Sequence, residues 1–198
     1  MVSPDDGKRT EGGFDLNSIM HASEPLTTKE FFALDVDEKL KVELFGGALA
    51  VSPSSKIWHG IVSLLLRDAL VASLGPGFRV YLDLDVIVDE ENVPRPDVFV
   101  VHSSPYDPDR VTEAADVLLA VEIMSPGSKT NDRRIKPALY RDAGIPSWRI
   151  ERSGKRLLLV EIPLSGEGQT HLGPITLKVA GIDVLIDLDA IARDALGE

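Results

Sequence analysis

Two apolar stretches rich in β-branched residues are each marked by one acidic residue. Asp97 stands directly before residues 98–101, and Glu122 stands near the end of residues 117–124. Stretches of this composition and length predict strands that are buried in a sheet. A carboxylate among buried side chains costs free energy unless a cation, a hydrogen-bond network or a metal ion compensates its charge. Two such acids could converge on one metal ion, so the first hypothesis is a metal-dependent hydrolase.

The length and composition of the chain predict one globular domain. The chain has 198 residues, of which 43% are hydrophobic and 27% are charged, and this is enough to bury a sizeable core. We expect the domain to span residues 26–198. Residues 1–25 are polar and contain Gly, Pro, Ser and Asp without periodicity, so they predict a flexible N-terminal tail.

The net charge and the absence of cysteine argue against several kinds of binding site. The formal net charge is −11, which counts against strong nonspecific binding of nucleic acid, although a local basic patch can still form. No cysteine occurs, so disulfides and thiolate zinc sites are excluded. No run reaches about 18 apolar residues, and the N-terminus lacks the apolar core of a signal peptide. These features predict a cytoplasmic protein that does not enter a membrane.

Hydrophobic periodicity and turn residues predict an α+β fold. Residues 117–124 are almost continuously apolar, which is typical of a central strand buried on both faces. Thr27 and Glu30 form a capping-box pattern at a helix start. The other expected elements are hairpins at 41–51 and 147–162, strands at 78–88, 175–179 and 184–186, a polar loop at 103–113, and helices at 56–73, 130–143 (kinked or restarted at Pro137) and 188–196. The 78–88 strand should pair with the Asp97 strand. Together the elements predict a central mixed, bent β-sheet with flanking helices.

The two acids occupy positions that suit a shared site. Pro96 cannot donate to a strand ladder, so it places Asp97 where a strand begins. Glu122 lies near the end of the next long strand. If the two strands pair, both carboxylates can point into one cleft, and such hard oxygen ligands suit Mg²⁺ or Mn²⁺. The residues alone leave a second interpretation open for each acid, namely a salt bridge or the capping of a turn.

A longer series of residues carries a resemblance to a known family. The series comprises Val42-Glu43-Leu44 with Gly46-Gly47, Ser52-Pro53, His59, Arg95-Pro96-Asp97-Val98, Val121-Glu122-Ile123-Met124-Ser125-Pro126, Asp132, Lys136, Tyr140, Gly144 and Trp148. In this order it resembles the Uma-two family of proposed endonucleases, within the PD-(D/E)XK nuclease superfamily. The resemblance covers roughly residues 25–190 and implies the restriction-endonuclease-like form of the α+β fold.

The resemblance implies a divalent-metal nuclease centre that binds Mg²⁺ or Mn²⁺ and acts on nucleic acid, with DNA as the expected substrate. Asp97 and Glu122 match the two metal-binding acids of the superfamily motif, and the backbone carbonyl of Ile123 would be a third ligand. Glu43 matches an acid from the N-terminal element that could bind a second ion or a metal-bound water. By the same resemblance, we expect a homodimer.

The lysine of the motif is missing, because Met124 stands two residues after Glu122. Such a lysine matters because its ammonium group orients the attacking water and offsets charge that develops on the phosphate. Lys136 is the first candidate to replace it, since it lies on the following helix where the family carries a lysine. Lys129, closer in sequence but on a loop, is the second. A solvent-exposed helical lysine is the alternative interpretation of Lys136.

Three other residues have weaker claims to the site. His59 starts the long helix and could assist proton transfer, although a structural or surface histidine is the alternative. Arg133 could contact phosphate, or it could pair with an acid. At helical spacing Arg133 shares a face with Lys136 and Tyr140, and Tyr140 itself is expected in the core.

Three functions compete on this sequence. The first is a metal-dependent endonuclease that uses Glu43, Asp97, Glu122 and Lys136. The second is a catalytically inactive nuclease fold that acts as a regulatory or interaction module, which the net charge of −11 and Met124 favour. The third is a metal phosphoesterase for small substrates.

Overall fold

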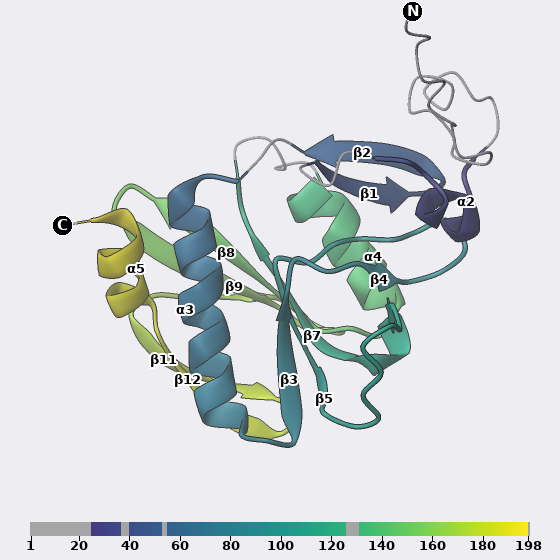
Figure 1. Cartoon of the computed structure of the whole chain (residues 1–198). Coiled ribbons are helices and arrows are strands. Elements are labelled where there is room, and N and C mark those ends of the chain that lie inside the picture. Colours follow the sequence, from purple (N-terminus) through teal and green to yellow (C-terminus); the bar gives the residue numbers. More distant parts are fainter. Residues whose placement is uncertain (1–24, 37–39, 53–54, 126–130, 198) are drawn as a thin grey trace, which may run out of the picture.

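A computed structural model describes residues 25–36, 40–52, 55–125 and 131–197 (Figure 1). The predicted N-terminal tail, apart from Pro25, lies outside these described residues. Within them, six strands form a mixed sheet in the order β10-β9-β8-β7-β5-β3. The strands are β3 (Phe78–Leu82), β5 (Val98–His102), β7 (Val117–Ile123), β8 (Ser147–Ser153), β9 (Arg156–Ile162) and β10 (Gln169–His171). Strands β7 and β8 are parallel, and the other neighbours are antiparallel. The predicted α+β fold with a mixed sheet is confirmed.

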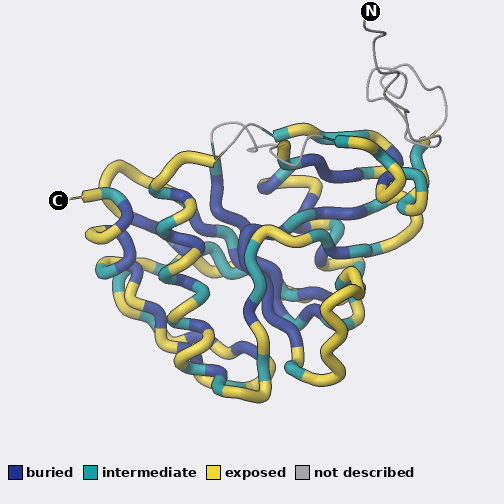
Figure 2. The backbone as a smooth tube through the Cα atoms, viewed as in Figure 1, coloured by how far each residue is buried: buried dark blue, intermediate teal, exposed yellow. Residues whose placement is uncertain are grey.

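The sheet is buried on both faces, and alternation along its strands decides what each face contacts. On β5, Val98 and Val100 join a core with helix α3 (Ile57–Leu74) and helix α5 (Leu188–Leu196). Phe99 faces the other way and packs with Tyr140 of helix α4 (Lys136–Asp142). Figure 2 shows these central strands as the most buried part of the backbone. The expectation of a central strand buried on both faces is confirmed for β7, where only Leu118 is not fully buried.

A separate hairpin lies beyond the end of the sheet where β5 begins (Figure 1). It consists of β1 (Lys41–Phe45) and β2 (Ala48–Ser52), and its turn is Gly46-Gly47 as predicted. Leu44 is bridged to Val93, on the segment that leads to Asp97. This pairing aligns β1 with the start of β5. The remaining elements are α2 (Thr28–Phe32, with the predicted Thr27 capping box), β4 (Val86–Ile87), β6 (Thr112–Glu113), a 3₁₀ turn (Ala114–Asp116), β11 (Pro174–Val179) and β12 (Ile182–Asp187).

The prediction of one strand over residues 78–88 is wrong. Strand β3 ends at Leu82, because Asp83 adopts a positive φ of 51° that an extended strand cannot contain. The backbone N–H of Asp83 then donates to the carbonyl of Asp97. The chain resumes as β4, which pairs with β6 inside the expected polar loop. The first part of the prediction is confirmed, since β3 pairs antiparallel with β5.

The helix predicted over residues 130–143 is divided in two. Residues Asn131–Ile135 form a π-helix, and α4 then runs over Lys136–Asp142 with Pro137 in its first turn. A proline there is favourable, because its missing N–H has no intrahelical partner at that position. The expected restart at Pro137 is therefore confirmed. Residue 130 lies outside the described residues.

Among the described residues, α3 alone is long and apolar enough to cross a membrane by length and composition. Its buried positions, which include Val62, Leu66 and Leu70, recur every three or four residues. They pack against the sheet, β12 and α5. These residues form the core-facing side of α3, whereas the large apolar side chains of Ile57, Leu64 and Val71 on the same helix are exposed.

Gly47 provides a test of how the hairpin is attached. Both turn glycines have positive φ, 55° at Gly46 and 72° at Gly47, so alanine is strained at either position. A Cβ at Gly46 would meet nothing, whereas a Cβ at Gly47 would overlap the side chain and backbone of Pro25. We expect Gly46→Ala to lower the free energy of unfolding by about 1 kcal/mol and Gly47→Ala by about 2–3 kcal/mol. Urea unfolding of the two variants measures the difference, and equal losses would contradict the contact with Pro25.

Candidate functional site

Asp97 connects the two central strands at the end of the sheet. It directly precedes β5, and its Oδ2 accepts a hydrogen bond from the backbone N–H of Ile123 on β7 at 2.7 Å. Its Oδ1 accepts from Nζ of Lys41 at 2.7 Å. Both carboxylate oxygens are therefore bonded, and the side chain is only 8% exposed. The predicted pairing of the two acid-bearing strands is confirmed, with Val98 opposite Val121.

Glu122 points to the face of β7 that α4 covers, because its neighbours Val121 and Ile123 face α3. Its Oε2 accepts from Nζ of Lys136 at 2.9 Å, and its Oε1 accepts from the hydroxyl of Tyr140 at 2.6 Å. Lys136 and Tyr140 are one helical turn apart on α4. Sequence reasoning placed Tyr140 in the core, where it is, but missed this hydrogen bond.

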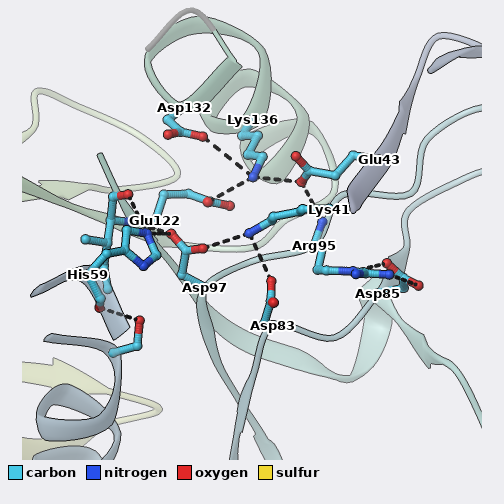
Figure 3. Close-up of polar contacts among 12 residues, drawn as sticks. Lys41, Glu43, His59, Asp83, Asp85, Arg95, Asp97, Glu122, Asp132 and Lys136 are labelled. Carbon is cyan, nitrogen blue, oxygen red and sulfur yellow. Dashed lines mark hydrogen bonds and ion pairs between the residues drawn. The ribbon is translucent and has the colours of Figure 1, made fainter. Parts of the chain in front are cut away.

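Lys136 is shared by three acids from three parts of the chain (Figure 3). Its Nζ lies 2.8 Å from Glu43 on β1, 2.9 Å from Glu122 on β7 and 3.6 Å from Asp132 on the π-helix. The Lys136 side chain is 2% exposed. The alternative of a solvent-exposed helical lysine is wrong.

The strand alternation of β1 places two charged residues beside the acids. Val42 and Leu44 enter a small core with Val93, so Lys41 and Glu43 face the other way, toward Asp97 and Lys136 (Figure 3). Sequence reasoning missed Lys41. The alternating pattern of residues 41–44 was the signal that could have paired it with Glu43.

His59, in the first turn of α3, lies against the same two strands. Its Nε2 is 3.2 Å from Oδ2 of Asp97 and 3.0 Å from the carbonyl oxygen of Ile123. Because a carbonyl oxygen only accepts, Nε2 carries the hydrogen. The ring is buried, so the alternative of a surface histidine is wrong. Oδ2 of Asp97 and the carbonyl oxygen of Ile123 therefore both lie within hydrogen-bonding distance of the same N–H group of His59.

The charges of Asp97 and Lys41 stabilise each other. Burial alone would raise the pKa of Asp97, but the Lys41 ammonium and the His59 hydrogen bond hold that pKa well below its usual range. Burial would lower the pKa of Lys41, and the Asp97 carboxylate raises it above its usual value instead. Both groups are ionised at neutral pH.

The pKa of Glu122 is shifted in the opposite direction to the pKa of Asp97. Burial raises its pKa to about 8, and the nearby Asp97 and Asp132 raise it while Lys136 lowers it. Burial opposes the charge of Lys136 too, but its acidic neighbours raise the pKa of Lys136 well above its usual value. One ammonium group cannot neutralise three carboxylates, so Glu122 holds a proton that an ordinary glutamate loses near pH 4.

The site has an excess of negative charge and of oxygen donors. Four carboxylates line it, from Glu43, Asp97, Glu122 and Asp132, against the ammonium groups of two lysines. The enclosed space is about 20 Å³, enough for one water-sized species. A divalent cation would balance the excess, and Mg²⁺ and Mn²⁺ prefer such oxygens. In the described residues, no three acids or histidines are already placed as a ligand group, and lysine, histidine and tyrosine hydrogens are bonded to the carboxylate oxygens. The donor types and the charge fit a divalent ion, which would share those oxygens.

Two further residues that the sequence singled out, Arg133 and Met124, do not line the acidic site. Arg133 is turned out of the face of Lys136 by the wider π-helical turn, and it pairs with Glu151 at 2.8 Å. The idea that Arg133 pairs with an acid is confirmed. Met124 is buried but does not line the acidic site. Lys129 lies outside the described residues.

The raised pKa of Glu122 predicts a stability change with pH. As pH rises past about 4.5 the unfolded chain releases this proton, whereas the folded chain keeps it until about pH 8. The free energy of unfolding should therefore fall between about pH 5.5 and 8, relative to Glu122→Gln, by about 3 kcal/mol. Urea unfolding of both proteins in chelator measures this difference. A difference that is constant with pH would mean that Glu122 is ionised throughout.

Comparison with known proteins relates this site to a family. The model of the Uma2 family, described as "Putative restriction endonuclease", matches residues 28–174. No curated protein shows significant sequence similarity to the chain. Among solved structures, the chain is similar to a crystal structure titled as a putative nuclease belonging to DUF820 from Anabaena variabilis ATCC 29413. The TM-score is 0.69 at 16% identity, over 86% of this chain and 99% of that chain, which shows a shared fold. Because the family match spans more than half of its residues, the chain belongs to the Uma2 family of restriction-endonuclease-like proteins.

Proposed function

We propose that this protein is a metal-dependent endonuclease that hydrolyses phosphodiester bonds of nucleic acid, with DNA as the preferred substrate. One observation carries the proposal: Glu43, Asp97, Glu122 and the Ile123 carbonyl gather around one small space together with Lys136. Family membership and fold support a nuclease of the restriction-endonuclease-like kind. The homodimer and the cytoplasmic location stay predictions.

The ion would be held by Asp97, Glu122 and the carbonyl oxygen of Ile123, with Glu43 available to a second ion or to its water. We infer Mg²⁺ or Mn²⁺ from the all-oxygen donor set. When bound, such an ion polarises a phosphoryl oxygen and lowers the pKa of a bound water. It would also lower the pKa of Glu122, because a nearby cation favours the carboxylate form.

The residues of the chain position these groups and supply positive charge. Lys136 is protonated, and its ammonium group can orient a water and offset charge that develops on the phosphate, which is the task of the missing motif lysine. Tyr140 fixes Glu122 through the second carboxylate oxygen. Lys41 supplies a second ammonium group, which is bound to Oδ1 of Asp97. His59 holds Asp97 beside the Ile123 carbonyl.

A second function is favoured by a specific observation. Met124 occupies the position of the motif lysine, and the oxygens of Asp97 and Glu122 are already bonded to Lys41, His59, Lys136 and Tyr140. A site stabilised in this way can hold the fold together without an ion. The alternative is therefore a catalytically inactive nuclease fold that acts as a regulatory or interaction module.

Metal binding tests the shared site. Because an ion that binds only the folded state stabilises it, we expect millimolar Mn²⁺ or Mg²⁺ to raise the melting temperature of the wild type. Asp97→Asn should abolish the increase, since it removes one ligand charge. Asp68→Asn is the matched control, because Asp68 is exposed and pairs with Arg67 away from the site. If the ion raises the melting temperature of the Asp97→Asn variant as much as that of the wild type, the proposed set of ligands is wrong.

Cleavage tests the activity. Wild type, Asp97→Asn, Lys136→Met and Asp68→Asn are incubated with plasmid, single-stranded DNA and RNA in Mn²⁺, and products are resolved on gels. We expect wild type and Asp68→Asn to cut DNA, and the other two variants to lose at least 100-fold in rate, a typical cost of removing one transition-state contact. Metal-dependent stabilisation without cleavage of any substrate would support the inactive alternative.

A further inference from the structure

A second pocket adjoins the acidic site and has the opposite charge. Its volume is about 370 Å³, which is within the range of small-molecule sites, roughly 300–1,000 Å³. Ser125, at the end of β7, lines both this pocket and the acidic site. The residues that line it are Lys56, Trp58, Met124, Ser125, Arg133, Glu151, Arg152 and Gly154. We call it the Trp58 pocket.

The Trp58 pocket is basic in a strongly acidic chain. Three cations line it, from Lys56, Arg133 and Arg152, against the single carboxylate of Glu151. That carboxylate is bonded on one oxygen by Arg133 at 2.8 Å and on the other by Arg149 at 2.7 Å. The pocket therefore has two positive charges in excess, whereas the whole chain has a net charge of −11. Such a local excess attracts a polyanion.

Trp58 gives the pocket an aromatic surface. The side chain is half-buried and packs partly against the core beneath α3. The guanidinium carbon of Arg152 lies 5.6 Å from the centre of its ring, near the outer limit of about 6 Å for a cation–π contact. Unpaired bases stack on an aromatic ring of this kind while neighbouring cations bind their phosphates.

Two other cavities of comparable size lack the excess of positive charge, although Arg79 lies 4.1 Å from the centre of the Tyr106 ring in one of them. The cavity of about 280 Å³ beside Arg79 and Tyr106 has two arginines balanced by two aspartates. The cavity of about 300 Å³ beside Trp148 has one lysine and one glutamate. Neither includes a residue of the acidic site. Since the acidic site itself has room for only one water-sized species, a nucleotide has to be held beside it.

We propose that the Trp58 pocket binds an unpaired nucleotide of a nucleic-acid strand next to the scissile phosphate. The base stacks on Trp58, and Lys56, Arg133 and Arg152 bind the flanking phosphates. The inference rests on the proposed nuclease function and sharpens it, because the substrate becomes a single-stranded or unpaired segment.

Trp58 reports on the pocket directly. The chain has two tryptophans, and the other, Trp148, is 2% exposed. We expect oligo(dT) to quench the tryptophan fluorescence of the wild type in chelator, where no cleavage occurs. The quenching should be absent in Trp58→Phe. A U-rich RNA oligonucleotide tests whether ribose is accepted, and a blunt duplex should quench at least tenfold more weakly at equal concentration.

Affinity variants separate stacking from charge. By fluorescence anisotropy, Trp58→Ala should weaken oligo(dT) binding about 10- to 100-fold, in line with the loss of one stacked base. Lys56→Ala and Arg152→Ala, at exposed positions, should each reduce the dependence of affinity on salt. Arg67→Ala is the matched control, because Arg67 is a half-buried arginine elsewhere on α3, and it should change neither the affinity nor its dependence on salt. If Trp58→Ala does not fold, the salt dependence of oligo(dT) binding by Lys56→Ala and Arg152→Ala still tests the pocket.

The outcomes distinguish this inference from the proposed function. Quenching by oligo(dT) with no cleavage in Mn²⁺ would support the pocket and contradict the nuclease. Cleavage by the wild type, with unchanged quenching and affinity in the Lys56, Trp58 and Arg152 variants, would support the nuclease and overturn the pocket. Equal binding of duplex and single strand without quenching would also overturn it.

Discussion

The ammonium group of Lys136 is the contact on which the arrangement of the site depends. It joins Glu43 of the β1–β2 hairpin, Glu122 of the central sheet and Asp132 of the π-helix, at 2.8, 2.9 and 3.6 Å. Glu43 is distant in sequence from the other three residues, which lie between positions 122 and 136. All four side chains are nearly inaccessible to water. Removing one member of a buried ionic group leaves the others uncompensated and costs about 3–5 kcal/mol. The position of α4 is therefore coupled to the charge of the acids.

The same contact explains why the site suits a cation and why it folds without one. Lys136 and Lys41 neutralise two of the four carboxylates, and the protonation of Glu122 removes a third charge at neutral pH. A metal ion offers another way to reach balance, in which Glu122 releases its proton. A proton and a metal ion then compete for the Glu122 carboxylate. Metal affinity should therefore increase with pH, because the ion binds the deprotonated form.

The sequence predicted the parts of the site that depend on local pattern. Asp97 at a strand start and Glu122 in a doubly buried strand follow from composition and proline placement. The strand break at Asp83 was not predictable from alternation, since the apolar residues continue in register across it while the backbone turns. The alternating pattern of residues 41–44 indicates that Lys41 shares a face with Glu43, but it does not encode the contact of Lys41 with Asp97, which is 56 residues away. Arg133 was misplaced because ideal helical spacing was assumed where the chain forms a π-helix.

The net charge of −11 does not describe the charge at each surface, because the fold distributes the charged side chains unevenly. The chain places four acids in a space for one ion and three cations along the pocket that shares Ser125 with it. Field strength at a binding surface depends on charges within about a Debye length, near 10 Å at moderate salt. A surface with a local excess of cations can therefore attract a phosphate strand although the molecule as a whole repels one. If the Trp58 pocket holds a strand as we propose, the shared residue Ser125 would place the four acids beside that strand.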